Sequence, residues 1–361
     1  MRGSIKVAAF LFIAAFAIFY FILPPFFATS YSRKDLVLSS VAKALTPAPM
    51  LDKPLYDKLM LMLANNPRAA TSTASSTPPN AATSTVAKKY LWPADAPYPN
   101  AGALLPFNRI VAYYGNFYSK AMGVLGEYPR GEMIAKLNRE VSKWNAADPS
   151  TPVIPAIQYI AVTAQGSAGD GKYRLRMPNS EIDKALDIAN EMHGILILDV
   201  QVGKSTLEEE LPKFASYLKL PNVHLGIDPE FSMKGGEKPG TVIGTMDATD
   251  VNYAVNFLAN IVKENNLTPK IIIVHRFTQH MVTNSTKINP TQEVQVVMDM
   301  DGWGSPWHKE KAYLDTVYEY PVQFTGIKLF YKNDLRAPST RMLTENEVLN
   351  LRPIPSYIQY Q

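Results

Sequence analysis

Short apolar runs alternate with amphipathic segments along most of this chain, and the alternation leaves few architectures open. Such a pattern is typical of parallel strands that are covered by helices. Segments with a helical spacing of apolar residues, such as 179–194 and 247–266, separate most of the runs. The runs that have the length and composition of buried strands cover residues 109–117, 152–161, 194–203, 222–231, 270–277, 294–304, 325–331 and 356–361.

The number of these runs favours a closed barrel over an open sheet. Eight strands between residues 90 and 361 match the length of a (β/α)₈ unit, and no glycine-rich phosphate loop follows the first strand. We therefore predict that the fold class is α/β, with a (β/α)₈ TIM barrel over residues 90–361. If the last run, 356–361, does not form a strand, an open α/β sheet is the alternative.

The N-terminal residues 1–30 have the pattern of a signal anchor or transmembrane segment. Arg2 and Lys6 precede an uncharged apolar run over residues 7–23. At about 1.5 Å per residue this run approaches the thickness of a bilayer core, and it is longer than a usual signal-peptide core. We expect a membrane anchor with the rest of the chain outside the cytoplasm. Small residues at 28–30 leave cleavage and secretion as the alternative.

Two further segments separate the apolar N-terminus from the predicted barrel. Residues 31–70 include apolar positions with helical spacing, among them Leu55, Leu59 and Met62, which predict a membrane-proximal helix or a helix docked on the barrel. Residues 71–89 are rich in Ser, Thr, Ala and Pro, and such a composition buries too little apolar area to order itself. We interpret 71–89 as a disordered linker.

Charge and cysteine content exclude several functions. The formal net charge is +4, and Lys and Arg are scattered along the chain, so we expect no nucleic-acid partner. The chain contains no cysteine, which excludes disulfides, a thiolate nucleophile and zinc sites made of cysteine. No H-x-H or H-E-x-x-H spacing occurs either, so the sequence predicts neither a metal site nor a cofactor.

Carboxylates close several of the predicted strands. In a barrel of this type the working face lies at the C-terminal ends of the strands. Side chains alternate along a strand, so Asp228 and Glu230 share one face with Gly226 and are expected to point into the mouth. Asp299 and Asp301 close another strand at the same spacing. These four acids, Asp228, Glu230, Asp299 and Asp301, are our candidate catalytic residues.

Crowded carboxylates favour acid–base chemistry. They repel one another and are partly desolvated, which raises the pKa of at least one of them and keeps it protonated near neutral pH. A protonated carboxylic acid beside an ionised one is the pair of groups that glycoside hydrolases use to break a glycosidic bond. Aromatic faces and polar groups at the same strand ends would bind the sugar. The candidate substrate-binding residues are Tyr113, Tyr114, Gln158, Asp199, Gln201, His275, Arg276 and Trp303.

Two motifs resemble the family 18 glycoside hydrolases, which include chitinases and endo-N-acetylglucosaminidases. "RIVAYYGNF" on the first strand is followed by "GIDPEF" on the fourth, where the family has a D-x-D-x-E pattern. The resemblance implies that Glu230 donates the proton and that Asp228 orients the N-acetyl group of the substrate. The first aspartate of the family pattern is Gly226 here. In "MDMD", Asp301 matches the aspartate of the family motif M-x-Y-D, and Met300 replaces its tyrosine. A remote barrel family without an assigned activity is the alternative.

The sequence therefore predicts an extracytoplasmic, glycoside hydrolase-like barrel that acts on a cell-surface glycan, a cell-wall polymer or another glycan containing N-acetylglucosamine. Two mechanisms remain open. Either the acetamido group of the substrate attacks the anomeric carbon, or Glu230 pairs with Asp299 or Asp301 as acid and nucleophile. The alternatives are an inactive barrel that binds a glycan or a protein and, less favoured, a metal-dependent hydrolase.

Overall fold

The computed structural model describes residues 50–67 and 90–361, and its central feature is a closed barrel of eight parallel strands. The predicted TIM barrel is therefore confirmed, including its eighth strand, which pairs with β1 and closes the ring. The barrel strands, in the order in which they pair around the ring, are β1 (Arg109–Gly115), β2 (Val153–Ala164), β4 (Ile195–Val200), β5 (Val223–Ile227), β7 (Lys270–His275), β9 (Val294–Met300), β10 (Phe324–Leu329) and β11 (Tyr357–Tyr360).

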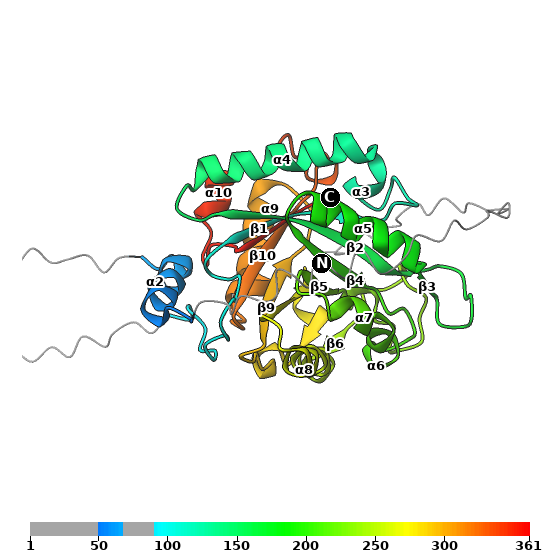
Figure 1. Ribbon diagram of the computed structural model, residues 1–361. Coiled ribbons are helices and arrows are strands. Elements are labelled where there is room, and N and C mark those ends of the chain that lie inside the picture. The colour runs from blue at the N-terminus through cyan, green and yellow to red at the C-terminus, as the bar shows by residue number, and fades with distance from the viewer. Residues whose placement is uncertain (1–49, 68–89) are drawn as a thin grey trace, which may run out of the picture.

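Helices surround the barrel, as Figure 1 shows. Two of them are long: α4 (Arg130–Ala147) and α8 (Ala248–Asn265), whose first turn is held by a capping box of Asp247 and Asp250. The shorter helices are α3 (Val124–Glu127), α5 (Asn179–Glu191), α6 (Leu207–Glu210), α7 (Ala215–Leu218), α9 (Pro306–Tyr313) and α10 (Glu345–Leu349). Three short strands lie outside the ring: β3 (Arg174–Arg176), antiparallel to the end of β2, and the parallel pair β6 (Met246–Asp247) and β8 (Val282–Thr283).

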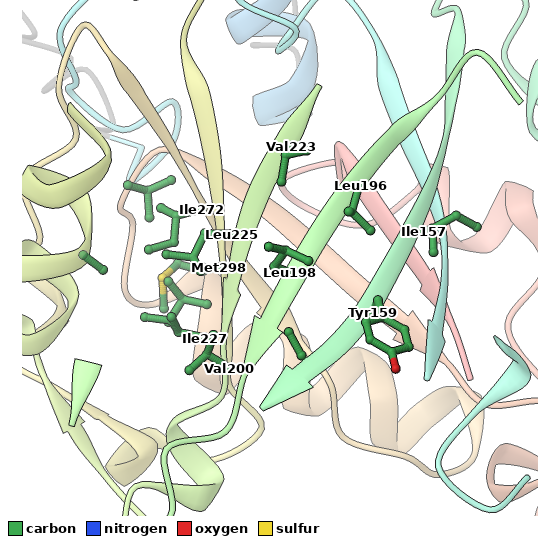
Figure 2. Packing of buried hydrophobic residues seen from close by; sticks show 14 of the residues in the cluster. Ile157, Tyr159, Leu196, Leu198, Val200, Val223, Leu225, Ile227, Ile272 and Met298 are labelled. Atoms are coloured by element: carbon green, nitrogen blue, oxygen red, sulfur yellow. The ribbon is translucent and has the colours of Figure 1, made fainter. Parts of the chain in front are cut away.

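The alternation of side chains along each strand divides the core into two parts. Outward-facing residues pack under the helices, and Figure 2 shows several of them on neighbouring strands, such as Leu196 and Leu198 on β4 and Leu225 on β5. Inward-facing residues of the lower strand halves, such as Ile110 and Ile197, fill the base of the barrel with apolar side chains. Two polar side chains in this lower half, His224 and Gln295, are hydrogen-bonded to the backbone of Ile271 and Leu105, and the inward-facing charged residues lie in the upper, C-terminal half above this floor.

Helix α2 (Lys53–Ala64) closes the N-terminal end of the barrel. Its Tyr56 and Met60 are buried in the same apolar cluster as the inward-facing residues of the strand bases. The backbone N–H of Ile354 also donates to the carbonyl of Leu63 at 2.7 Å. Part of the predicted segment 31–70 is thus a helix docked on the barrel, on the side opposite the strand ends that carry the acids.

Several predictions about the N-terminal region concern residues outside the described ranges. The anchor or signal segment at 1–30, residues 31–49 and the linker at 71–89 are among them. Within residues 50–67 and 90–361, no helix combines the length and the apolar character needed to cross a bilayer.

Candidate active site

A buried histidine lies between two carboxylates in the upper half of the barrel. His275, at the end of β7, has its Nε2 atom 3.2 Å from Asp199 Oδ1 and its Nδ1 atom 3.1 Å from Asp299 Oδ2. Burial alone would lower the pKa of His275, but the hydrogen bonds to these two carboxylates raise it well above its usual value. The imidazole is therefore a cation, held between β4 and β9.

Two glycines on neighbouring strands make room for this arrangement. Gly226 on β5 is in register with Asp199, and a Cβ atom there would overlap Asp199 Oδ1 and lie 2.8 Å from Gln158 Nε2. Gly326 on β10 is in register with Asp299, and a Cβ atom there would lie 2.6 Å from Asp299 Oδ1. The place where the family 18 pattern has its first aspartate is thus occupied by Asp199 of the neighbouring strand.

Neutral polar side chains orient Asp199 and connect it to the mouth. Gln158 Nε2 donates to Asp199 Oδ1 at 2.8 Å and lies 2.9 Å from His275 Nε2. The hydroxyl of Tyr114 donates to Asp199 Oδ2 at 3.2 Å. Gln201 Nε2 donates both to Tyr114 Oη at 3.2 Å and to Asp228 Oδ2 at 3.3 Å. One hydrogen-bonded chain therefore links the buried histidine to the acids above it.

Asp228 and Glu230 lie just beyond β5, in a 3₁₀ turn (Pro229–Phe231). Asp228 Oδ1 accepts from the backbone N–H of Glu230 at 3.1 Å, so Asp228 also caps this turn. Burial, followed by the charges of Asp228 and Asp301, raises the pKa of Glu230 to about 8. Burial likewise raises the pKa of Asp228 to about 7, with His275 opposing the rise. At neutral pH Glu230 therefore retains its proton.

Asp301 lies one residue beyond β9 and is 8% exposed. Its Oδ2 atom is 3.6 Å from His275 Nδ1, and its Oδ1 atom is buried without a hydrogen-bond partner. Burial raises the pKa of Asp301, while the positive charges of His275 and Lys328 oppose the rise. Asp301 is thus a carboxylate with a free oxygen at the mouth.

Two residues of this site were not among the sequence-based candidates. Lys328 on β10 is 5% exposed, and its Nζ atom lies 3.8 Å from the centre of the Tyr114 ring. Gln359 on β11 is fully buried and donates from Nε2 to the hydroxyl of Tyr357 at 2.9 Å. The sequence signal that could have identified these two residues was a polar side chain at an inward-facing position of each strand, at the same height in the barrel as the acids of neighbouring strands.

Two predicted substrate-binding residues point away from the mouth, so these assignments are corrected. Tyr113 faces the helices, where its hydroxyl lies 3.0 Å from that of Tyr331. Arg276 donates to the carbonyl oxygens of Gln279 at 2.8 Å and Val282 at 3.2 Å, and it therefore holds the loop after β7. Each is the chain neighbour of a residue that does face inward, and adjacent strand residues face opposite sides.

The remaining aromatic candidate, Trp303, lies in the loop after β9. It is 36% exposed, and the guanidinium of Arg336 lies 5.2 Å from its ring. Trp303 therefore belongs to the rim of the barrel.

The chemistry of the site follows from its charges. Five carboxyl groups, Asp199, Asp228, Glu230, Asp299 and Asp301, face two cations, His275 and Lys328. Among residues 50–67 and 90–361, no group of three or more His, Asp or Glu side chains has an arrangement that could hold a metal ion. The site can therefore donate a proton from Glu230 and stabilise positive charge with the neighbouring carboxylates.

Comparisons with known proteins leave the family open. No protein-family model matches the chain, and no curated protein matches it. Among solved structures, the cellulase Cel5C_n is 13% identical, with a TM-score of 0.35; the match covers 62% of this chain and 65% of that one. A sugar phosphate isomerase/epimerase from Parabacteroides distasonis is 10% identical, with a TM-score of 0.28 and coverage of 71% and 96%. GH26C from Muricauda sp. is 11% identical, with a TM-score of 0.29 and coverage of 70% of each chain.

Similarities at this level carry no argument about function, and none of them supports membership of family 18. The assignment of the TIM-barrel fold rests on the pairing of the eight strands. Any statement about the reaction has to come from the residues at the mouth.

Proposed function

We propose that this barrel is a glycoside hydrolase in which Glu230 is the general acid. The proposal rests on one observation: Glu230 is the most exposed of the five acids, and burial together with the charges of Asp228 and Asp301 raises its pKa to about 8. At neutral pH it is therefore protonated and within reach of a ligand. In the reaction Glu230 transfers this proton to the glycosidic oxygen as the bond from that oxygen to the anomeric carbon breaks.

Asp301 is the carboxylate that we propose for stabilising the positive charge that develops at the anomeric carbon. Asp199 and Asp299 are engaged with His275, and Asp228 caps the turn that carries Glu230. Asp299 and Asp301 each keep one oxygen without a partner, and of the two residues Asp301 is the more exposed, at 8% against 0%. This assignment favours the acid and carboxylate pair over the acetamido mechanism that the family 18 resemblance implied, in which Asp228 would orient the substrate.

The proposed substrate is a glycan of the cell surface or the cell wall. The uncharged run at residues 7–23 supports a chain held at a membrane with the barrel outside the cytoplasm. Helix α2, the described segment nearest to that run, packs on the base of the barrel.

A second candidate function is a barrel that binds a glycan without turnover. The low exposure of the proposed second carboxylate favours it, because Asp301 is only 8% exposed, whereas hydrolysis needs both acids at the reacting carbon. In such a protein the carboxylates would serve as hydrogen-bond acceptors for sugar hydroxyls.

Hydrolysis assays on the full chain distinguish these functions. The substrates are peptidoglycan and β-linked oligomers of glucose, mannose and N-acetylglucosamine, and Glu230→Gln is compared with the wild type. Loss of a general acid lowers kcat by about 10²- to 10⁴-fold, whereas Glu237→Gln, an exposed residue of the same loop, leaves it unchanged. Full activity in Glu230→Gln would refute the acid role. Binding without hydrolysis in the wild type would favour the second candidate.

A further inference from the structure

We propose that Asp301, Lys328 and Gln359 form a clamp for two neighbouring hydroxyl groups of a neutral sugar. The proposal rests on the proposed function in one respect, because it takes the acid-lined mouth as the substrate site. It adds the class of sugar that this site accepts, namely one without an N-acetyl group and without a negative charge.

The three residues lie side by side on consecutive strands of the barrel. Lys328 on β10 is in register with Gln359 on β11. On the other side, Ile327 is in register with Met300 of β9, which places Asp301 level with Lys328. Lys328 shares the inward face of β10 with Gly326, so its side chain enters the barrel on the same side as Asp299. The clamp therefore occupies one level of the wall formed by β9, β10 and β11.

Each member of the clamp has hydrogen-bonding capacity that the rest of the described chain does not use. The Lys328 ammonium contacts the rings of Tyr114 and Phe330, at 3.8 and 5.2 Å from their centres, but makes no hydrogen bond or salt bridge within residues 50–67 and 90–361. Asp301 Oδ1 and Gln359 Oε1 are buried there without partners. Leaving a polar group buried and unpaired carries a free-energy cost in the protein without a ligand. A ligand that supplies the missing partners recovers this cost.

The pattern of donors and acceptors identifies the ligand. An ammonium only donates, and a carboxylate or an amide oxygen only accepts. A hydroxyl group does both, so one hydroxyl can accept from Lys328 and donate to Asp301. A second hydroxyl on the next carbon can then donate to Gln359 Oε1. Two adjacent hydroxyls therefore satisfy all three groups.

Other sugar substituents fit this wall less well. An acetamido group can accept from Lys328 through its carbonyl and donate to Asp301 through its N–H, but these two groups point in opposite directions, so it does not serve both side chains at one point as a single hydroxyl does. A carboxylated sugar meets five acidic side chains and only two cations. The excess of acidic groups disfavours its negative charge. The clamp therefore selects sugars such as glucose or mannose, with free neighbouring hydroxyls, over N-acetylglucosamine.

Binding to the full chain with Glu230→Gln tests the clamp without the complication of turnover. The probes are cellobiose, β-1,4-mannobiose and N,N′-diacetylchitobiose, each measured by calorimetry. We expect one of the neutral disaccharides to bind at least about tenfold more tightly than the acetylated one, as for one hydrogen bond to a charged group. Adding Lys328→Met is expected to weaken that binding by a similar factor. Lys120→Met removes an exposed lysine from the loop after β1 and is expected to change nothing.

The results separate the clamp from the proposed hydrolysis. If Lys328→Met binds the neutral sugar as tightly as its parent, the clamp is refuted, although Glu230 can still be the acid. If the wild type hydrolyses nothing but binding depends on Lys328, the clamp stands and the hydrolase proposal fails. Preference for the acetylated sugar, or no binding of any probe, overturns the clamp. The ligand comparison uses one protein, so it remains decisive even if Lys328→Met does not fold.

Discussion

Because the pKa of Glu230 is raised, the free energy of unfolding of this protein should fall as the pH rises. A single substitution at Glu230 should remove that contribution. The native state holds the Glu230 proton up to about pH 8, whereas the pKa of an unperturbed glutamate is 4.5. Between these values the folded chain binds more protons than the unfolded chain, so the free energy of unfolding falls as the pH rises. In Glu230→Gln the side chain cannot ionise, so this contribution to the pH dependence of the free energy of unfolding disappears.

The structure sets the size of the effect. One pKa unit corresponds to about 1.4 kcal/mol, so the displacement of the Glu230 pKa from 4.5 to about 8 is worth at most about 5 kcal/mol. Glu230, Asp228 and Asp301 share their protons, so part of the slope passes to the other two acids when Glu230 is replaced. We therefore expect Glu230→Gln to gain about 2 to 4 kcal/mol relative to the wild type between pH 5 and pH 9.

Urea unfolding followed by circular dichroism, at one-unit steps from pH 5 to pH 9, measures this difference. The two proteins should be nearly equal at pH 5, where Glu230 is protonated in the folded wild type, and should diverge above it. Glu237→Gln provides the matched control, because it makes the same chemical change at an exposed site. A constant difference between Glu230→Gln and the wild type over this range would show that Glu230 titrates normally, and the reasoning for the general acid would fail.

Two further predictions concern the barrel interior and the N-terminus. Gly226→Ala places a methyl group on Asp199 Oδ1, so we expect a loss of about 1 to 3 kcal/mol in the free energy of unfolding. In contrast, Gly131→Ala on α4 meets no atom within 4 Å and should cost nothing; equal losses in urea titrations would contradict the crowding argument. Deletion of residues 1–30 is expected to move the protein from the membrane to the soluble fraction of its host cell. An unchanged distribution would rule out the anchor.

The strands could be predicted from the sequence because a fully buried parallel strand is apolar on both faces and its period is visible in the residue types. The mouth could be predicted only in part. Tyr113 and Tyr114 are equally plausible sugar contacts as residue types, yet only one of two adjacent strand residues can face inward. The same applies to His275 and Arg276. A strand that is apolar on both faces contains no signal that distinguishes its faces, so the correct residue of each pair had to come from the closed barrel.

Lys328 and Gln359 were missed for a different reason. Each is a single polar residue within an apolar run, and such residues often stabilise a core. Their role depends on the register in which β9, β10 and β11 pair, and the sequence of one strand does not reveal its register with the next. Similarly, Gly226 indicated a departure from the family 18 pattern, but only the register with Asp199 shows that a carboxylate from the next strand fills the vacant space.

The arrangement of charges explains why the proton is held at the mouth and not deeper in the barrel. His275 lies between Asp199 and Asp299 and balances part of their charge in the lower layer. Burial is the largest cause of the raised pKa values of Asp228 and Glu230; the negative charges of Asp199 and Asp301 add to it for Asp228, and those of Asp228 and Asp301 add to it for Glu230. Because Glu230 has the higher pKa of these two acids, it retains its proton longer as the pH rises. His275 opposes the rise for both acids, so burial and the neighbouring carboxylates keep the proton on Glu230, the most exposed of the five acids.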